Sequence, residues 1–349
     1  MKILHAADLH LDTPFTGYDP TQARYLREQL LTLPQRLATL CRKEQCDLVL
    51  LAGDLFDGPC SQESVRTLAA ALEECAVPVF ISPGNHDYVS LNSPYTTALW
   101  PSNVHIFKHP VMESVYLEAL DCRVYGAGYR CMDCGGLLEG FHAKSEARRH
   151  IGILHGTPTR GDSPCCPVTV AQILSSGLDY LALGHIHKTG FVRHGKTLCA
   201  WPGCPMGRGF DETGDKGVFI VTLEEEVRAD FVSLDVPRFL ELKTDDPEQV
   251  LPALGNEDFY RITLTGTDNG IPIETLRRRF SHFPNLQFID GRTPDLPLWE
   301  DIHKDTLEGA YFRNLKDALE KADEEDQAIV NLAARISRQI LDGQEVALP

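Results

Sequence analysis

Five short motifs rich in aspartate, asparagine and histidine carry the residues of this chain that are best suited to bind metal ions. They are Asp8-Leu9-His10, Gly53-Asp54-Leu55-Phe56-Asp57, Gly84-Asn85-His86-Asp87, the single His155 and Gly184-His185-Ile186-His187. Any one of these residues alone is more often structural than functional, so the prediction depends on their combination. Imidazole nitrogens select borderline cations such as Mn, Fe, Zn and Ni, and carboxylates join them in mixed sites. The combination predicts two adjacent divalent cations.

Cysteine is absent from these five motifs. Structural zinc sites are closed and often use cysteine, whereas catalytic sites keep a position for water or substrate. The motifs therefore favour a centre that is open to substrate oxygens. Elsewhere the chain contains Cys131-Met132-Asp133-Cys134 and Cys165-Cys166. A lone C-x-x-C beside an adjacent pair is a weak signal for zinc, and ordinary thiols are the preferred interpretation.

The elements that must position the motifs are strands, because each motif follows an apolar run. The first three motifs follow runs at 2–7, 47–52 and 77–82, and two amphipathic helical patterns, at 21–46 with an interruption at Pro34 and at 61–74, separate those runs. This alternation predicts a parallel β-α-β-α-β start. Parallel α/β sheets bind ligands beyond the carboxyl ends of their strands, which is where the motifs fall.

The later part of the chain continues with strands and then changes character. Two further apolar runs, at 150–154 and 179–183, end at His155 and at the last motif. Shorter strands are expected within 115–125, at 191–193 and 197–201, and as an antiparallel ladder at 218–223 and 229–234. Pro237 is the predicted boundary of a first domain, residues 1–236. A small α/β cap domain is expected over 237–300, and a C-terminal helical segment over 301–349, with one helix at 305–341.

Composition limits the class of protein. The chain has 349 residues, of which 43% are hydrophobic and 24% charged, and this is enough for a large globular core. No apolar run reaches the roughly 20 residues that span a bilayer, and the first residues enter a strand directly. Eleven scattered cysteines fit reduced thiols, so a cytoplasmic protein without a membrane partner is expected. The formal net charge of -17 argues against a surface coated in basic residues for nucleic acid.

Taken together, the motifs resemble those of one family, the calcineurin-like metallophosphoesterases, whose pattern runs D-x-H, G-D-x-x-D, G-N-H-D/E, H and G-H-x-H. All five elements are present here in that order. The resemblance implies an α/β (α+β) fold, a four-layer αββα sandwich of two mixed sheets followed by the small cap domain and a terminal helix. It also implies two divalent metal ions, manganese first, with Fe, Zn, Ni or Mg as alternatives.

The family's ligand roles carry over to matching residues of this sequence. One metal would be held by Asp8, His10, Asp54 and His187, and the other by Asp54, Asn85, His155 and His185. Asp54 would be the bridge. His86 would be the catalytic residue that stabilises or protonates the leaving oxygen, and Asp57 and Asp87 would orient the ligands or His86. A hydroxide held between the two cations would attack the phosphorus atom.

Two stretches resemble the bacterial DNA-repair nuclease branch, the SbcD- and YhaO-like exonucleases. They are residues 1–12 and the run from Gly184 through Trp201-Pro202-Gly203 to Glu212-Thr213-Gly214-Asp215-Lys216-Gly217. Within the second stretch, the Pro202-Gly203 and Glu212–Gly217 segments contain no expected metal ligand, so their similarity indicates a shared backbone geometry. This resemblance implies a DNA exonuclease or endonuclease of DNA repair, with an SMC-like or AAA-like ATPase partner and a homodimer as further expectations.

The acidic balance is unusual for a protein that holds a polyanion, because phosphate contacts normally come from lysine and arginine. The candidate contacts are Arg24, Arg27, Arg130, Lys188, Arg193, Arg208 and Arg277-Arg278-Arg279. Two alternatives to a DNA nuclease therefore stay open. One is a hydrolase of small nucleotides or other phosphoesters, and the other is a non-catalytic scaffold for an ATPase.

Overall fold

The computed structural model describes residues 1–343 except 145, 160–162, 252–253, 269, 294–295 and 297, so the end of the expected C-terminal segment lies outside the described residues. The chain divides into two compact units. The first contains the described residues of 1–242, 254–261 and 283–287, and the second contains the described residues of 243–251, 262–282 and from 288 onward. Among the described residues, no helix has both the length and the apolar character needed to span a membrane.

Two six-stranded mixed sheets form the first unit. The first sheet has the order β14-β13-β1-β2-β3-β4 and the second has the order β11-β12-β10-β7-β6-β5. In the first sheet β1 to β4 are parallel, and β13 is antiparallel to both β1 and β14. In the second sheet β6, β7, β10 and β12 are parallel, while β5 and β11 are antiparallel edges. The parallel β-α-β-α-β start is therefore confirmed.

The strands of the first sheet are β1 (Lys2–Ala6), β2 (Leu48–Leu51), β3 (Val79–Ile81), β4 (Val104–Ile106), β13 (Gly217–Leu223) and β14 (Val227–Ser233). The strands of the second sheet are β5 (Glu113–Leu117), β6 (Cys122–Gly126), β7 (Arg149–His155), β10 (Tyr180–Gly184), β11 (Gly190–His194) and β12 (Thr197–Trp201). A small two-stranded sheet pairs β8 (Thr157–Pro158) with β9 (Pro167–Val168).

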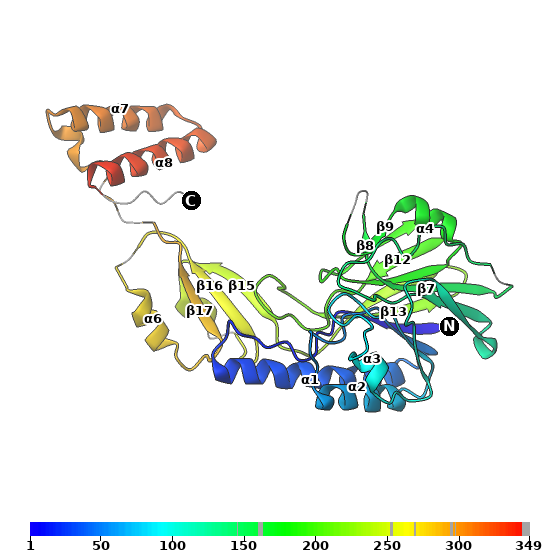
Figure 1. Cartoon of the computed structure of the whole chain (residues 1–349). Coiled ribbons are helices and arrows are strands. Elements are labelled where there is room, and N and C mark those ends of the chain that lie inside the picture. The colour runs from blue at the N-terminus through cyan, green and yellow to red at the C-terminus, as the bar shows by residue number, and fades with distance from the viewer. Residues whose placement is uncertain are drawn as a thin grey trace. The chain divides into compact units, whose positions relative to one another are not determined.

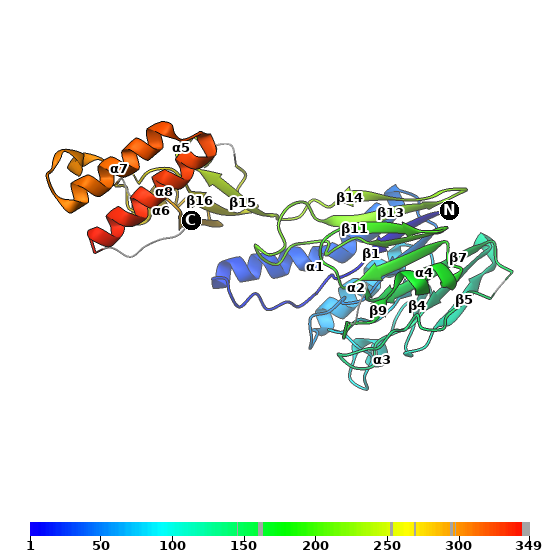
Figure 2. The same ribbon diagram turned by 90° about the horizontal axis from the view of Figure 1, so that it is seen from above.

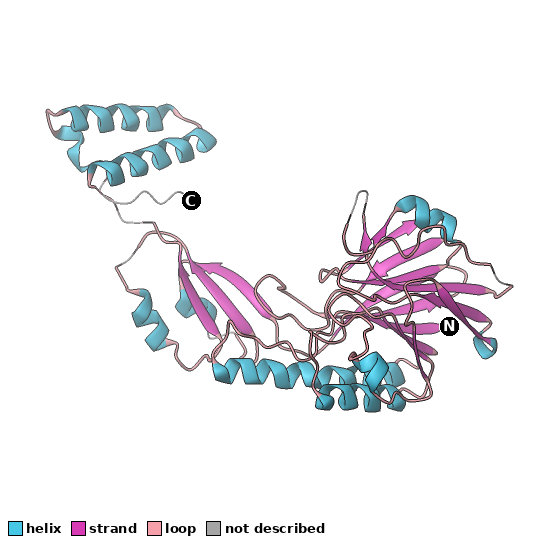
Figure 3. Ribbon diagram, in the orientation of Figure 1, coloured by secondary structure: helices cyan, strands magenta, loops and turns pink. Residues whose placement is uncertain are grey.

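The layers of the first unit follow from three apolar clusters. Helices α1 (Pro20–Lys43) and α2 (Gln62–Glu74) bury leucines against one face of the first sheet, and α3 (Pro94–Thr97) lies nearby. A second cluster fills the space between the two sheets, where Ile3, Phe80 and Ile151 are fully buried. A third cluster packs α4 (Val170–Ser176) against the far face of the second sheet. The order helix, sheet, sheet, helix is visible in Figures 1 and 3 and confirms the expected four-layer sandwich.

Helix α1 differs from the expectation in one respect. The sequence predicts an interruption at Pro34, but the helix continues across Pro34 from its N-cap Asp19 to Lys43. A proline inside a helix removes one backbone hydrogen bond, at a cost of about 3 kcal/mol. Leu30, Leu33 and Leu37 are almost fully buried around it, and each such side chain contributes roughly 1.5–3 kcal/mol on burial. The packing of this leucine stripe outweighs the lost hydrogen bond.

After β14, the described residues form a three-stranded sheet and four α-helices. The sheet has the order β15-β16-β17, with β15 (Phe239–Thr244), β16 (Phe259–Leu264) and β17 (Leu286–Asp290). The helices are α5 (Pro247–Val250), α6 (Ile273–Arg279), α7 (Leu307–Lys321) and α8 (Glu324–Leu341). The prediction of one helix over 305–341 is therefore wrong. Asp323 ends the run because its side chain accepts a hydrogen bond from Asp326 N as the N-cap of α8, and α7 and α8 pack as a pair (Figure 2).

A buried histidine joins the two sheets of the first unit. His5 of β1 lies between Tyr180 and Leu183 of β10, with its Nδ1 2.7 Å from the Tyr180 hydroxyl and its Nε2 3.1 Å from the Leu183 carbonyl oxygen. The carbonyl can only accept, so Nε2 carries the proton and Nδ1 accepts from Tyr180. Burial lowers the pKa of His5 from 6.5 to about 3, which keeps the folded imidazole neutral.

We expect this histidine to make the protein sensitive to acid. Above pH 6.5, His5 is neutral in both the folded and the unfolded protein. Between pH 6.5 and about pH 3, His5 binds a proton in the unfolded protein but not in the folded one, so the free energy of unfolding falls as the pH falls. The loss is about 1.36 kcal/mol per pH unit, or roughly 2 kcal/mol between pH 6.5 and pH 5. Urea unfolding at pH 7.5 and pH 5, in chelator, should show a smaller acid loss in His5→Gln than in wild type or in the exposed control His109→Gln. Equal losses of unfolding free energy in all three proteins would contradict this role of His5.

Candidate metal centre

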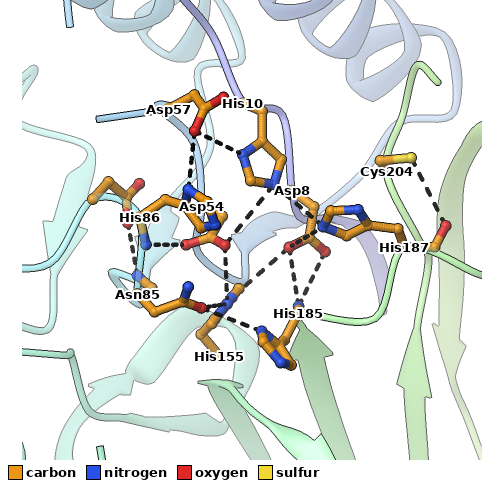
Figure 4. A network of polar contacts seen from close by, with 12 residues as sticks. Asp8, His10, Asp54, Asp57, Asn85, His86, His155, His185, His187 and Cys204 are labelled. Carbon is orange, nitrogen blue, oxygen red and sulfur yellow. Dashed lines mark hydrogen bonds and ion pairs between the residues drawn. The ribbon is translucent and has the colours of Figure 1, made fainter. Parts of the chain in front are cut away.

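All seven predicted metal ligands lie in one cluster, where strand ends of the two sheets of the first unit meet (Figure 4). β1, β2 and β3 of the first sheet lead to the first three motifs, and β7 and β10 of the second sheet lead to the last two. The first sheet thus supplies four of the ligands and the second sheet supplies His155, His185 and His187. Sequence reasoning placed every ligand at a strand end, and the stacking of the two sheets brings those ends together.

The backbone of the site is tightly turned. Asp8, His10, Asp54 and His185 have left-handed backbone angles, with φ of 54°, 47°, 49° and 88°. Such a conformation costs of order 1–3 kcal/mol for a residue other than glycine. Hydrogen bonds between the first two motifs hold it, since Asp8 N donates to the Gly53 carbonyl and His10 N to the Asp54 carbonyl, both at 2.9 Å. The turns direct these side chains into the cluster.

The motif glycines are explained by close approach. A Cβ atom on Gly84 would lie 2.2 Å from Asp54 Oδ1, and one on Gly184 would lie 2.0 Å from the Ala52 carbonyl oxygen. A Cβ atom on Gly53 would lie 2.5 Å from His155 Nδ1. No larger residue fits at these positions without moving a predicted ligand or the backbone beside it.

The first group of ligand atoms belongs to Asp8, His10 and His187, which lie within 4.8 Å of one another. His10 Nε2 is 3.3 Å from His187 Nε2, and His187 Nε2 is 3.8 Å from Asp8 Oδ1. His10 Nδ1 is buried without a hydrogen-bond partner among the described residues. Imidazole nitrogens that face each other and a carboxylate at this distance fit a shared divalent cation.

The second group belongs to Asp54, His155 and His185, with Asn85 beside them. His155 Nδ1 lies 2.9 Å from the Ala52 carbonyl and therefore donates to it, which leaves the lone pair of Nε2 free. That Nε2 lies 2.9 Å from Asn85 Oδ1 and 3.2 Å from Asp54 Oδ2. With Nε2 unprotonated, three acceptor atoms face one point, which fits a second cation in place of the Nε2 proton.

The pKa values of the buried acidic and imidazole groups also support a metal site. Burial raises the pKa of Asp8 to about 6. Burial acts to lower the pKa of His155, but the carboxylates of Asp54 and Asp8 outweigh it and raise that pKa to about 9. Buried carboxylates are normally paired with protons, cations or metals. The donor set therefore fits divalent metal ions.

Asp54 lies between the two groups. Its Oδ2 atom is 3.9 Å from His10 Nε2 in the first group and 3.2 Å from His155 Nε2 in the second. Its other oxygen, Oδ1, accepts a hydrogen bond of 2.9 Å from His86 N. One oxygen of Asp54 therefore faces both groups, which is the position expected of a bridging carboxylate.

His86 lies beside the cluster and is partly open to solvent. Its side chain is 42% exposed, and its ring contacts the His10 ring edge to face at 4.9 Å between centroids. The Nδ1 atom lies 2.9 Å from Asp57 Oδ1. This hydrogen bond raises the pKa of His86 and lowers the pKa of Asp57 to about 2. Asp57 thus fixes the orientation of the His86 ring, which is one of the two roles that the family resemblance implies for it.

Asp87 has a different task from Asp57. It is buried, and its Oδ1 accepts from Gly84 N at 2.8 Å while its Oδ2 accepts from Leu55 N at 2.7 Å and from the Tyr95 hydroxyl at 2.5 Å. These bonds tie the loop after β2 to the loop after β3. Asp87 therefore fixes the backbone that carries Asp54 and Asn85 and has no hydrogen bond to His86 among the described residues.

Sequence reasoning missed the role of Glu212. This buried carboxylate lies 2.5 Å from His187 Nδ1 and accepts from Arg208 N and Nη2 at 2.8 and 2.9 Å. Burial alone would raise the pKa of Glu212, but the hydrogen bonds from His187 and Arg208 hold it well below its usual range. A proton on His187 Nδ1 leaves Nε2 free for a metal. The usable signal was that each metal-ligating histidine needs a partner for its second nitrogen.

We expect Glu212→Gln to weaken metal binding. Loss of such a partner costs about 10- to 100-fold in metal affinity or activity, because the charge that fixes the histidine tautomer is removed. The Mn²⁺ concentration that gives half-maximal activity should rise by that factor, while circular dichroism stays unchanged. The exposed control Glu225→Gln should behave like wild type, and an unshifted Mn²⁺ titration of Glu212→Gln would refute the role.

The sequence also offered basic residues as phosphate contacts and cysteines as possible metal ligands. Of the basic residues considered as phosphate contacts, Arg208 lies at the cluster, with its Nη1 3.9 Å from Asp57 Oδ2. All eleven cysteines are free thiols. Among the described residues, Cys131, Cys134, Cys165 and Cys166 take part in no group of three potential ligand atoms, whereas Cys204 lies within one with His187 and Glu212.

Three relatives of known name show similarity over a large part of the chain. The uncharacterized metallophosphoesterase YhaO of Bacillus subtilis is 37% identical over 63% of this chain and 57% of its own length. The SbcD component of the nuclease SbcCD from the same organism is 26% identical over 63% and 66%, respectively. The DNA double-strand break repair protein Mre11 of Aeropyrum pernix is 25% identical over 58% and 53%. The alignments thus span between about half and two thirds of each relative.

The family assignment depends on a match to the first half of the chain. Residues 1–189 match the family described as calcineurin-like phosphoesterases, and they contain all five motifs. The two mixed sheets are those that the family resemblance implies, and the motif residues cluster as potential metal ligands. The chain therefore belongs to the calcineurin-like phosphoesterase family.

Proposed function

We propose that this protein is a two-metal phosphodiesterase that hydrolyses DNA, with Mn²⁺ as the first choice of cation and Fe, Zn, Ni or Mg as alternatives. The observation that supports it most is the convergence of free imidazole lone pairs and the Asp54 carboxylate on two neighbouring points. Asp8, His10, Asp54 and His187 would hold one cation, and Asp54, Asn85, His155 and His185 the other. When bound, two such cations neutralise phosphoryl oxygens and make an attacking water more acidic.

The chain's own residues complete the chemistry. His86 donates a proton to the leaving oxygen, and Asp57 holds the ring in place through Nδ1, so that Nε2 is the atom that gives the proton. Arg208 is held by Glu212, its Nη1 lies 3.9 Å from Asp57 Oδ2, and its guanidinium would contact a phosphate oxygen there. The tightly turned backbone keeps the ligands fixed before substrate arrives, which limits the reorganisation needed at each turnover.

The choice of DNA as substrate draws on the relatives. One is named as a subunit of a nuclease and another as a DNA double-strand break repair protein. The formal net charge of -17 favours the second candidate, a hydrolase of small nucleotides or phosphoesters, because a polyanion is repelled more strongly than a small ester. A non-catalytic scaffold is the third candidate, and the partly exposed His86 speaks against it.

The deciding experiment compares two substrates. Purified protein is incubated with Mn²⁺, Fe²⁺, Zn²⁺, Ni²⁺ or Mg²⁺, or with chelator, and an end-labelled oligonucleotide is tested beside the 4-nitrophenyl ester of thymidine 5′-monophosphate. Metal-dependent cutting of the oligonucleotide supports the nuclease, and its product ladder gives the polarity. Cleavage of the small ester alone supports the nucleotide hydrolase. Failure to cleave either substrate with any of the five metals would overturn the proposal.

We also propose an SMC-like or AAA-like ATPase partner, a homodimer and a cytoplasmic location. Support for the partner comes from the name of the relative that is one subunit of SbcCD. The expected result is that an ATPase of this class co-elutes with the protein from its native cells and raises oligonucleotide cleavage in an ATP-dependent manner. Sedimentation of the protein alone tests the homodimer.

A further inference from the structure

A groove of about 480 Å³ lies next to the metal centre on the outer side of the second sheet. We call it the Trp201 groove, and its main walls are Val168, Ile173, Ile186, Lys188, Val192 and Trp201. These residues come from β9, α4, β11, β12 and the loop after β10. β9 and α4 lie together in both views of the chain (Figures 1 and 2).

The Trp201 groove and the metal centre share one loop. His185 and His187 turn toward the predicted metal ligands, with His185 Nδ1 3.2 Å from Asn85 Oδ1 and His187 Nε2 3.3 Å from His10 Nε2. Ile186, between them in sequence, lines the groove instead, and so does Lys188, the next residue. A phosphate at the metals and a group in the groove are thus separated by a single loop.

Trp201 provides a flat apolar wall. It is half-buried and pairs across the strands with Gly190. A Cβ atom on Gly190 would lie 2.8 Å from three atoms of the indole, so the absence of a side chain there lets the indole lie on the backbone. The strand pair therefore fixes the ring, which also lines the groove. Aromatic rings held in this way stack against nucleobases, at about 1–3 kcal/mol per base.

Lys188 provides the charge at the edge of the groove. It is exposed, and it has no ion pair among the described residues. In a chain with a net charge of -17, a lysine without an acidic partner that follows a predicted metal ligand is well placed to meet a phosphate. The groove thus combines an apolar slot, an aromatic ring and a cation within reach of the site of phosphate chemistry.

From this juxtaposition we infer that the Trp201 groove holds the nucleobase next to the phosphodiester that is cleaved. The inference rests on the proposed phosphodiesterase function and specifies its substrate class as esters that bear a base. A base can enter the groove only when it is unpaired and unstacked, so single-stranded or frayed ends are the preferred substrates. Stacking is available to every base, so the groove selects for a base without selecting which one.

The test compares two esters that differ in the base. The first is the 4-nitrophenyl ester of thymidine 5′-monophosphate, and the second is methyl 4-nitrophenyl phosphate, which has no base. The ratio of their kcat/KM values should fall by between about 5- and 150-fold in Trp201→Ala, the equivalent of ~1–3 kcal/mol of stacking. Trp201→Phe should retain most of the ratio because it keeps an aromatic ring. Phe191→Ala, an exposed residue of β11, is the matched control and should keep the wild-type ratio.

A binding measurement separates this inference from the proposed function. Equilibrium dialysis with labelled thymidine 5′-monophosphate and Mg²⁺ requires no turnover, and Trp201→Ala should raise the Kd by the same factor. If wild type binds the nucleotide through Trp201 but cleaves no ester, the groove stands and the hydrolase proposal fails. If wild type cleaves both esters and Trp201→Ala changes neither the ratio nor the Kd, the groove inference is overturned and the hydrolase stands.

Discussion

Replacement of Asp54 by asparagine is expected to lower the kcat/KM of phosphodiester hydrolysis by at least about 10³-fold. Two metals contribute several kcal/mol of transition-state stabilisation, and each 1.36 kcal/mol is a factor of ten in rate. Asp54 Oδ2 faces His10 of one ligand group and His155 of the other, so its charge serves both cations. An amide keeps the shape of the side chain and loses that charge.

The measurement is the Mn²⁺ dependence of hydrolysis together with bound-metal content. Asp54→Asn should bind fewer than two metals per chain and should show no recovery of wild-type rate at high Mn²⁺. Its metal-free form should be less stable than wild type, because the variant loses the charge pair between Asp54 Oδ2 and His155 Nε2, which lie 3.2 Å apart. Circular dichroism checks that the variant is folded at the assay temperature. The exposed Asp230→Asn is the matched control. A rate for Asp54→Asn within tenfold of wild type would exclude Asp54 as the bridging ligand.

The parts of the fold that the sequence predicted are those determined by local pattern. The four residues of β2 are buried on both faces, and their unbroken apolar run predicted a strand with nearly the observed bounds. The same holds for β7 and β10, which end at His155 and just before His185. Pattern alone did not give the stacking of two sheets, because no local signal states which strands pair. That expectation came from the family resemblance.

The failures come from interactions between distant residues. Pro34 disfavours a helix locally, yet the leucines around it are buried against the first sheet and the helix continues. The pattern at 305–341 is helical on both sides of Asp323, and only the N-cap bond of that side chain to Asp326 N shows that a second helix starts there. In both places the local helix propensity points one way, and a contact that the sequence pattern does not reveal decides the structure.

The site shows the same division. The apolar runs predicted that the five motifs lie at strand ends, the family resemblance selected seven potential ligands among them, and the structure brings those residues together. Spacing could not find Glu212, which lies 25 positions from His187 and reaches it only because the loop after β12 folds back over the ligand loop. Nor could it show that Asp57 and Asp87 have separate tasks, since each is simply the last acidic residue of its motif.

Replacement of His86 by glutamine should separate proton donation from metal binding. General acid catalysis contributes about 10²- to 10⁴-fold, and kcat on an oligonucleotide should fall by that factor because the sugar oxygen needs a proton to leave. With 4-nitrophenolate as leaving group the loss should be much smaller, since this anion leaves without a proton. The Mn²⁺ titration should stay as in wild type, and the exposed His109→Gln is the control.

This comparison of leaving groups is informative because His86 also lies within 4.8 Å of potential ligand atoms of His10 and Asp57. If His86 held a metal, His86→Gln would reduce cleavage of both substrates equally and would shift the Mn²⁺ titration. As a proton donor it acts on one substrate only, and Asp57→Asn should then reproduce a weaker form of the same selectivity. The 2.9 Å hydrogen bond that His86 Nδ1 donates to Asp57 orients the ring and raises the pKa of His86. Equal losses on both esters would reassign His86 to the metal centre and leave the leaving oxygen to be protonated by solvent.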